Sequence, residues 1–407
     1  MLLATVADVF RYGASVWLLV AAFTLMGFLA IFVYLPVFFK LQVNNIYDYL
    51  EKRFDRKTRI LAVLFYILSE ILMFPVFAYT PSLTIATGKK LVKTFCCNNG
   101  SMVSASGVNV SLVAFILCVI CIFYTSVGGF RTVVWTDFLQ FGVIMAALVC
   151  IYVTGLGSSG GFISVWNTAL SGDRLQIFNF RVDPTARDSF WGYLLGSGAV
   201  STAVVIVHQT GAQKFLTLSK YTDCRWSVVH TVVSMSLVHT CCIFIGLLVY
   251  AKYKDCDPLT GHLVLKHDQI FPYFVTEVGS NFPGLVGLFI AAICSASLRY
   301  FLVCNRYNSK ICYSSMSSNL NALAGVLYKD IACFVLKKQS TDFNNSGSGI
   351  LKVIVLVVGA LCTCLVFVVE RLGEVLSISL MVTGLTQGPV LGVFTLGILF
   401  PKANSKV

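Results

Sequence analysis

Charged residues are scarce in this sequence of 407 residues: they make up 12% of it, while hydrophobic residues make up 57%. Soluble domains carry about 25% charged residues, so the composition excludes an ordinary soluble enzyme and a disordered chain. The apolar residues also lack the period-two alternation that a membrane barrel of strands requires. They form long continuous runs instead, which predicts an all-α, polytopic membrane protein.

Motifs of catalysis are missing as well. The sequence has no nucleotide-binding glycine loop, no HExxH pair and no Ser–His–Asp pattern, which argues against ATP-driven pumping and against hydrolysis. Most of its 15 cysteines lie in apolar runs, and the lone CxxC of Cys118 and Cys121 lacks a second half with zinc spacing. No basic run suits a nucleic acid. We therefore expect no enzyme activity, no cofactor and no nucleic-acid partner.

The apolar runs predict nine membrane helices in one domain that comprises residues 1–407. Their ranges are 14–39, 60–87, 108–127, 133–155, 191–213, 227–251, 283–327 (interrupted), 350–369 and 375–400. If residue 1 lies outside, the inner loops hold 16 Lys and Arg against 7 acids, and the outer loops 11 against 10. The positive-inside rule favours this orientation. It places the loops 156–190 and 252–282 outside, together with the candidate glycosylation sites Asn99 and Asn109.

Several predicted spans contain glycine, proline or hydroxyl residues where a plain anchor would have Leu and Val. The fifth span begins with three glycines in residues 191–199, the last contains Thr386 to Pro389, and the seventh holds a serine cluster at 314–318. Small residues also let membrane helices pack closely. Interrupted helices in several spans of one chain, however, are typical of a transport pathway.

Two carboxylates are candidates for function within the spans. Glu70 lies about ten residues into the second span, where an ionisable group is a functional candidate by default. The alternative is a hydrogen-bonded acid that faces a neighbouring helix. Asp137 follows Trp135 and Thr136 at the inner start of the fourth span and could attract a cation there, or be a solvated helix-start residue.

Polar residues also gather near the inner end of the fifth span. His208, Gln209 and Gln213 could line a polar path or simply mark the membrane boundary. His230 and His239, in the sixth span, have no carboxylate nearby in sequence and are interpreted as hydrogen-bonded core histidines. The serines of the cluster offer hydroxyl oxygens, which suit a small hard cation such as sodium.

Eight stretches of the chain resemble the sodium/solute symporter family, closest to its monocarboxylate, multivitamin and iodide transporter branch. They are residues 9–15, 46–54, 79–83, 128–137, 178–184, 254–258, 283–285 and 388–392, and the Gly128 to Asp137 stretch is the most specific. The resemblance implies an inverted-repeat (LeuT-like) fold, alternating access and coupling to sodium. It also implies a sodium site at Ser314 and Ser315 and a place for Asp137 on the sodium exit path.

The chain departs from the family pattern at three places. The segment before residues 9–15 is absent, so the first core helix is expected to be missing. Residues 299–313 bring three charges into the seventh span and are expected to be an insertion; without them, the backbone carbonyl of Ala296 would join the sodium site. Residues 89–106 are an extra outer loop segment.

We therefore predict a sodium-coupled symporter of a small organic anion, a vitamin such as biotin or pantothenate, or iodide. Its partners would be the lipid bilayer, Na+ and the solute, and it would act as a monomer in the plasma membrane, with Glu70, Gln209 and Gln213 on the solute path. The alternative is a symporter-like membrane protein without transport activity: a sensor, an assembly partner or the product of an incomplete gene model.

Overall fold

The structure is a computed structural model. It describes residues 2–41, 45–96, 110–183, 188–216, 218, 220–261, 263–264, 267–279, 282, 284–298, 316–328, 347–369, 375–400 and 402–404. Within these ranges the chain forms α-, 3-10 and π-helices and no strand, which confirms the all-α prediction.

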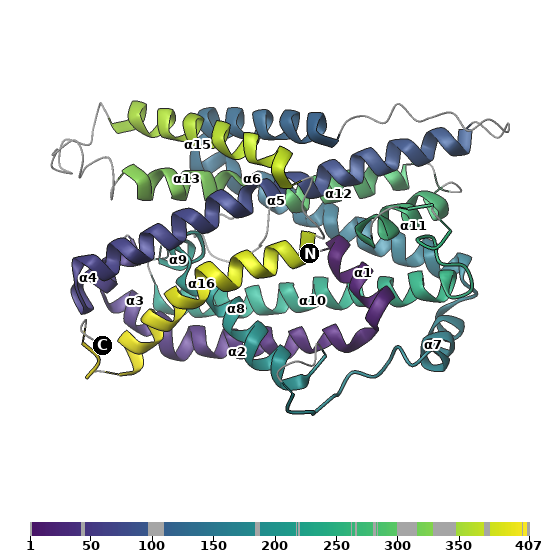
Figure 1. Cartoon of the computed structure of the whole chain (residues 1–407), viewed down its shortest axis with the longest axis horizontal. Helices are drawn as coiled ribbons and strands as arrows, with labels where there is room; N and C mark the ends of the chain where they lie inside the picture. Colours follow the sequence, from purple (N-terminus) through teal and green to yellow (C-terminus); the bar gives the residue numbers. More distant parts are fainter. Residues whose placement is uncertain are drawn as a thin grey trace.

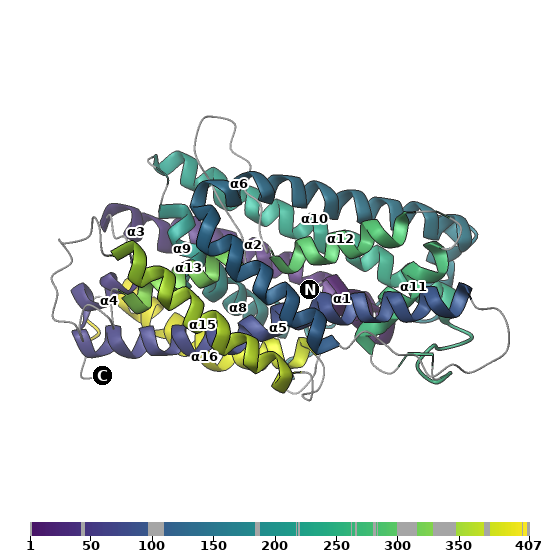
Figure 2. The same cartoon turned by 90° about the horizontal axis from the view of Figure 1, so that it is seen from above.

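The helices lie mostly along the long axis of the molecule, as Figures 1 and 2 show. In chain order they are α1 (Leu2–Tyr12), η1 (Ala14–Leu18), α2 (Leu19–Leu29), η2 (Ala30–Tyr34), α3 (Leu35–Leu41), α4 (Tyr47–Arg53), α5 (Arg56–Cys96), α6 (Val110–Ser158), α7 (Phe162–Ser171), η3 (Gly192–Ser197), α8 (Gly198–Thr202), η4 (Ala203–Val207), α9 (Gln209–Leu216), α10 (Tyr221–Tyr253), η5 (His267–Gln269), α11 (Ile270–Gly279), α12 (Leu285–Leu298), α13 (Met316–Val326), α15 (Gly347–Val369) and α16 (Val375–Leu399). The elements α3, α4 and α9 lie at one end of the long axis, and α7 and α11 lie at the other (Figure 1).

Five helical stretches in the described part of the chain are long and apolar enough to cross a membrane. They are Ala14–Leu41, Arg56–Ile85, Phe141–Ser158, Tyr221–Tyr253 and Ser379–Leu399. Three shorter apolar stretches, Gly192–Val207, Leu285–Cys294 and Val353–Val368, fall inside other predicted spans. A bilayer core of about 30 Å needs about 20 helical residues, so the chain is a multi-pass membrane protein.

Helix α5 shows how the sequence orients a span. Leu61, Leu64 and Leu68 are about half exposed and recur every three or four residues, which places them on one face of the helix. Tyr66 and Glu70 are four residues apart on the opposite face and are buried. Because other helices cover the second face, Glu70 points into the bundle.

The predicted spans 108–127 and 133–155 belong to one helical element, α6, which comprises Val110–Ser158. Helices α7 and α11 also occupy the segments 156–190 and 252–282, which were predicted only as loops.

The predicted extra segments lie largely outside the described residues. Helix α5 continues through Cys96, so the first part of 89–106 is helical. Helix α12 ends at Leu298 and α13 begins at Met316, and residues 299–315 between them are outside the described part. Figures 1 and 2 place α12 and α13 roughly end to end.

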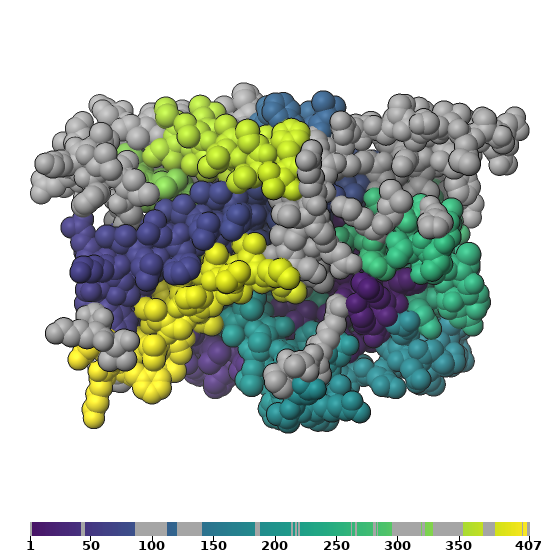
Figure 3. Space-filling view, viewed as in Figure 1, coloured from purple at the N-terminus to yellow at the C-terminus, as the bar shows by residue number. Residues whose placement is uncertain are grey.

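Two main groups of buried side chains hold the bundle together. The first joins α1, the second half of α6, α10, α11 and α12; the second joins the α2–α3 segment, α4, the first half of α5, η4, α9 and α16. Helices α5 and α16 pack against each other, and the space-filling view shows them adjacent on one face (Figure 3). The second group surrounds the polar residues described next.

Candidate functional site

The fifth predicted span is interrupted at His208, between η4 and α9. It contains two π-helical turns, η3 and η4, and then His208 takes an extended conformation with ψ 135° before α9 begins at Gln209. The backbone N–H of His208 donates to the carbonyl of Ala203 at 2.8 Å, a π-type bond across five residues. Such turns are frequent at functional sites. The break lies at His208 and not at the predicted glycine-rich stretch 191–199, which is helical in η3 and α8.

The break at His208 is tight because Gly211 allows two backbones to meet. A Cβ atom at Gly211 would lie 2.1 Å from the carbonyl oxygen of Val205. The turn of α9 after the break therefore rests directly on the last turn of η4, and only glycine leaves room for that contact.

A buried pair of ionisable side chains forms at the break. The Nε2 atom of His208 lies 3.1 Å from Oε1 of Glu70, and these side chains are 10% and 4% exposed. Glu70 comes from α5 and His208 from the break between η4 and α9. The structure thus brings together two residues that the sequence placed in different spans, and it puts the polar residues of the fifth span inside the bundle.

Aromatic and hydroxyl groups line this pair. The ring of Tyr66 packs edge-on against the imidazole of His208, with 4.7 Å between ring centroids. The hydroxyl groups of Tyr66 and Thr210 are 3.4 Å apart, and the ring of Tyr47 packs against Tyr66. Sequence analysis missed Tyr66 and Thr210, although the i, i+4 spacing of Tyr66 and Glu70 would have placed them on one face.

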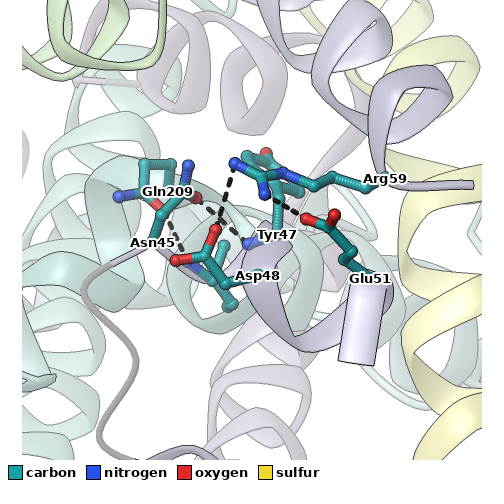
Figure 4. A network of polar contacts seen from close by, with 7 residues as sticks. Asn45, Tyr47, Asp48, Glu51, Arg59 and Gln209 are labelled. Carbon is teal, nitrogen blue, oxygen red and sulfur yellow. Dashed lines mark hydrogen bonds and ion pairs between the residues drawn. The ribbon is translucent and has the colours of Figure 1, made fainter. Parts of the chain in front are cut away.

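A second polar network lies between the break and the start of α4 (Figure 4). The Oε1 atom of Gln209 accepts a hydrogen bond of 3.0 Å from the backbone N–H of Ile46. Oδ1 of Asn45 accepts a bond of 3.1 Å from the backbone N–H of Tyr47. Gln209 is 5% exposed, and its bond to Ile46 ties the broken span to the start of α4.

Helix α4 is also tied to α5 and α16 by arginines. The guanidinium of Arg59 binds Asp48 at 3.1 Å and also binds Glu51 (Figure 4). Arg53 donates to the carbonyl oxygens of Gly397 and Phe400 at the end of α16, each at 3.1 Å. Unbonded carbonyls at a helix C-terminus carry partial negative charge. The positive charge of Arg53 is therefore stabilising at the end of α16.

One pKa shift at this end of the molecule has a clear cause. Asp55 precedes the first residue of α5, and its carboxylate accepts hydrogen bonds from the backbone N–H of Thr58 at 2.8 Å and from its hydroxyl group at 2.6 Å. These bonds, the side-chain one first, lower the pKa of Asp55 below its usual value. Asp55 is therefore the N-terminal cap of α5 in its ionised form.

The described residues leave several predicted positions untested. Gln213, Asp137 and Ala296 lie on α9, α6 and α12, but their side chains are outside the described part of the chain. Ser314, Ser315, Asn99 and Asn109 are wholly outside the described residues. The sodium site, its exit path and the glycosylation sites thus stay predictions.

The two histidines of α10 have structural partners. Nδ1 of His230 lies 2.9 Å from the carbonyl of Trp226, one turn earlier in the helix. Nε2 of His239 lies 3.1 Å from the carbonyl of Val16, and its ring packs against Phe23. His239 is 2% exposed and agrees with the interpretation as a hydrogen-bonded core histidine. His230 is hydrogen-bonded but partly exposed, so its assignment to the core is wrong.

Gln387 is a buried polar residue that the sequence analysis did not single out. It lies on α16, two residues before Pro389, and is 2% exposed. Among the described residues, neither its Oε1 nor its Nε2 atom has a hydrogen-bond partner. Pro389 lacks an N–H group and so leaves the carbonyl of Leu385 without its helical donor. The Thr386 to Pro389 stretch was the signal that could have pointed to Gln387.

Comparisons with known proteins found a matching family and several relatives. The sequence pattern of the sodium:solute symporter family matches residues 1–406. The chain is 33% identical over 402 residues to the sodium-coupled monocarboxylate transporter 2 of Danio rerio, covering 98% of this chain and 59% of that protein. It is 31% identical to the sodium-coupled monocarboxylate transporter 1 of Homo sapiens, covering 99% of this chain and 60% of that protein. It is 30% identical to a putative sodium-dependent multivitamin transporter of Drosophila melanogaster, covering 98% of this chain and 61% of that protein.

A solved structure has the same fold. The chain matches a Na+-coupled sialic acid symporter in a substrate-bound outward-open state with a TM-score of 0.78 at 20% identity, covering 100% of this chain and 76% of that one. At this identity the likeness shows the inverted-repeat fold and not the solute. The chain spans about 60% of the length of the curated relatives it matches.

Proposed function

Because the chain belongs to the sodium:solute symporter family, we propose that it couples the movement of a small organic anion or a vitamin to the inward sodium gradient. The observation that supports this function is the interrupted span at His208, which holds a buried ionisable pair among apolar helices. In secondary transporters, interrupted helices near the middle of the bilayer form the solute and ion sites. Iodide is a further member of the proposed solute class, and the proposed location is the plasma membrane.

The proposed sodium site consists of the hydroxyl oxygens of Ser314 and Ser315. The backbone carbonyl of Ala296 would join it if residues 299–313 are absent from the working transporter. Helices α12 and α13, which flank these residues, support this site by lying roughly end to end (Figure 2). Sodium prefers oxygen ligands, as other hard cations do, and Asp137 would attract the ion on its way to the inner side.

We assign Gln387 to the solute site, with Gln209, Gln213 and Glu70 along the polar path. A buried amide without partners is rare in folded proteins and calls for a ligand or an ordered water. The amide offers two donors and an acceptor, which match a carboxylate, a ureido group or an amide. Such groups occur in short organic acids and in biotin and pantothenate.

A solute screen tests this proposal. The purified full chain is reconstituted in lipid vesicles, and uptake of lactate, nicotinate, biotin, pantothenate and iodide is measured with sodium and with choline outside. We expect one solute class to enter only with sodium, and Ser315→Ala to need more sodium for half-maximal uptake. Ser159→Ala, outside the proposed sites, is the matched control. Uptake of every solute at equal rates in choline would contradict sodium coupling.

A further inference from the structure

Helix α7 has different residues on three of its sides. Val165 and Ala169 are four residues apart and are buried in the first core group. The side next to them is apolar and exposed, and spacings of three, four and seven residues place its members together. These members are Phe162, Ile163, Trp166 and Leu170. The third side is polar and exposed, with Ser164, Asn167 and Ser171 at spacings of three and four residues.

Helix α7 lies where two membrane-spanning stretches end. The stretch Phe141–Ser158 ends four residues before α7 begins, and Gly160 and Gly161 turn the chain between them with φ angles of 78° and 88°. Helix α7 then packs against α10, whose spanning stretch is Tyr221–Tyr253, at one end of the long axis (Figure 1). This position is at the level where both spans leave the apolar core of a bilayer.

Aromatic rings connect the exposed apolar side of α7 to these two spans. The ring of Trp166 stacks on that of Phe162 with 5.9 Å between centroids, and Phe162 packs against Phe244 of α10 at 6.4 Å. Phe244 in turn packs against Tyr152 of α6 at 6.3 Å. Phe244 and Tyr152 both belong to spanning stretches. The exposed apolar side of α7 is therefore continuous with the surface of the membrane-spanning helices.

The segment that follows α7 has a second exposed apolar surface. Leu175 and Ile177 pack against the first core group. Phe178, Phe180 and Val182 are 61%, 60% and 85% exposed, and they recur at every second position. One side of this segment thus rests on the bundle, and the opposite side presents large apolar groups.

A row of rings leads from this second surface to the start of another span. The rings of Phe178 and Phe180 stack with 6.0 Å between centroids. Phe180 packs against Phe190 at 5.1 Å, and Phe190 packs against Trp191 at 5.3 Å. Trp191 directly precedes the apolar stretch Gly192–Val207. Both exposed surfaces therefore join the membrane-spanning part of the molecule at the ends of its spans.

Contacts with the bundle hold both surfaces in place. A Cβ atom at Gly172 would lie 2.1 Å from the hydroxyl oxygen of Tyr250, so the end of α7 rests directly on α10. The guanidinium of Arg174 lies 4.5 Å from the centroid of the Tyr250 ring. The carbonyl of Arg174 accepts a hydrogen bond of 2.8 Å from the backbone N–H of Ala14. The exposed rings are thus fixed relative to the ends of α1 and α10.

We propose that the apolar side of α7 and the ring row from Phe178 to Trp191 form an interfacial anchor, which binds lipid at the boundary between headgroups and acyl chains. Tryptophan is enriched at this boundary, because its ring is apolar and its N–H group can bond to water or headgroups. An amphipathic helix in the boundary inserts its apolar side by about 5–10 Å and leaves its polar side in water. The three sides of α7 fit this arrangement.

Lipid fits this surface better than a second copy of the chain does. Both parts of the interfacial anchor continue into spans, so the bilayer already adjoins their edges. The interfacial anchor would set the depth of α1 and α10 in the membrane, through the contacts of Gly172 and Arg174. It requires a multi-pass membrane protein and does not depend on transport.

Moving one tryptophan around α7 tests the contact with lipid. In a Trp166→Phe chain, Ile163→Trp places the indole ring on the exposed apolar side, and Asn167→Trp places it on the polar side. The chain has five tryptophans, and those other than Trp166 stay the same in every variant. The purified full chains are reconstituted in phosphatidylcholine vesicles with or without bromine atoms on the acyl chains, and tryptophan fluorescence is measured. Acrylamide on both sides of the membrane serves as the quencher in water.

We expect brominated lipid to remove most of the fluorescence that Ile163→Trp adds to the Trp166→Phe chain, and little of the fluorescence that Asn167→Trp adds. Acrylamide should act in the reverse order. Unfolding temperatures close to that of the wild type show that the variants are folded. Leu170→Trp, on the same side as Ile163, takes its place if Ile163→Trp does not fold.

Two results would overturn the interfacial anchor. Quenching of Ile163→Trp by acrylamide as strong as that of Asn167→Trp, without quenching by brominated lipid, would show that water covers the apolar side. Weak quenching of Ile163→Trp by both reagents, together with cross-linked dimers whose share grows with the ratio of protein to lipid, would show that a second copy covers it.

Discussion

The break at His208 depends on Gly211, whose role could not be predicted from the sequence. Gly211→Ala introduces a Cβ atom 2.1 Å from the carbonyl oxygen of Val205, and backbone has to move to relieve the contact. We expect a loss of about 1–3 kcal/mol in the free energy of unfolding, the usual cost of overpacking. Gly142→Ala in α6, where a Cβ atom meets nothing within 4 Å, is the control and should be neutral or slightly stabilising. Equal unfolding temperatures for the two variants would show that the break does not depend on this contact.

Replacing the buried Gln387 should raise the stability of the chain and weaken its uptake of the solute. Gln387→Leu removes two buried polar atoms that have no partner among the described residues, and leaving such groups unsatisfied costs about 1–3 kcal/mol. The solute-free variant should therefore unfold at a higher temperature. Its KM for the solute should rise, because the amide would no longer contact the solute. Lower stability together with an unchanged KM would mean that Gln387 serves the fold alone.

Asp55 gives a pH-dependent effect at the start of α5. Its pKa is lowered in the folded chain by the donors of Thr58, so its contribution to stability is present above the ordinary pKa of about 3.8 and is lost as the pH falls through the lowered value. Asp55→Ala should unfold at a lower temperature than wild type at pH 7, and the two melting curves should converge in acid. A constant difference down to pH 2 would contradict the assignment of Asp55 as an ionised cap.

At the scale of elements, α4 connects three parts of the bundle. It bonds to Gln209 at the break, to Arg59 on α5 and to the end of α16. Arg53→Ala removes the donors to Gly397 and Phe400, and we expect a loss of about 1 kcal/mol, since bonds from charged donors to partly exposed carbonyls are modest. Lys52→Ala, the exposed neighbour, is the control. Unfolding temperatures are measured by differential scanning calorimetry. Equal temperatures for the two variants would show that Arg53 does not stabilise the contact between α4 and α16.

The elements also show what could be predicted from the sequence. Long apolar runs specify where a helix crosses a bilayer, so the spans around Arg56–Ile85, Tyr221–Tyr253 and Ser379–Leu399 were predicted closely. Short helices such as α7 and α11 were not predicted, because a helix that is stabilised by packing needs no strong helix pattern in its own sequence.

The candidate site was predictable in part. Glu70 and Gln209 stood out because polar groups are costly inside a membrane, and both are buried in the polar centre. Their partners could not be predicted: the Glu70–His208 contact joins residues 138 positions apart in the chain, and only the packing of α5 against the broken span brings them together.

At the scale of the whole molecule, the fold explains why a polar centre can exist inside an apolar chain. Exposed leucines cover the outside, and buried aromatic rings surround the pair within the second core group. The polar groups are therefore buried by neighbouring helices. The proposed alternating access, in which a site opens to one side of the membrane at a time, needs such a buried polar site.

The most direct test of the account is concentrative uptake. Vesicles that contain the purified full chain are given an inward sodium gradient, and the internal concentration of the solute identified in the screen is followed over time. The account predicts transient accumulation above the external concentration, which disappears when an ionophore collapses the sodium gradient. A solute that only equilibrates across the membrane, with or without the gradient, would contradict sodium-coupled symport by this chain.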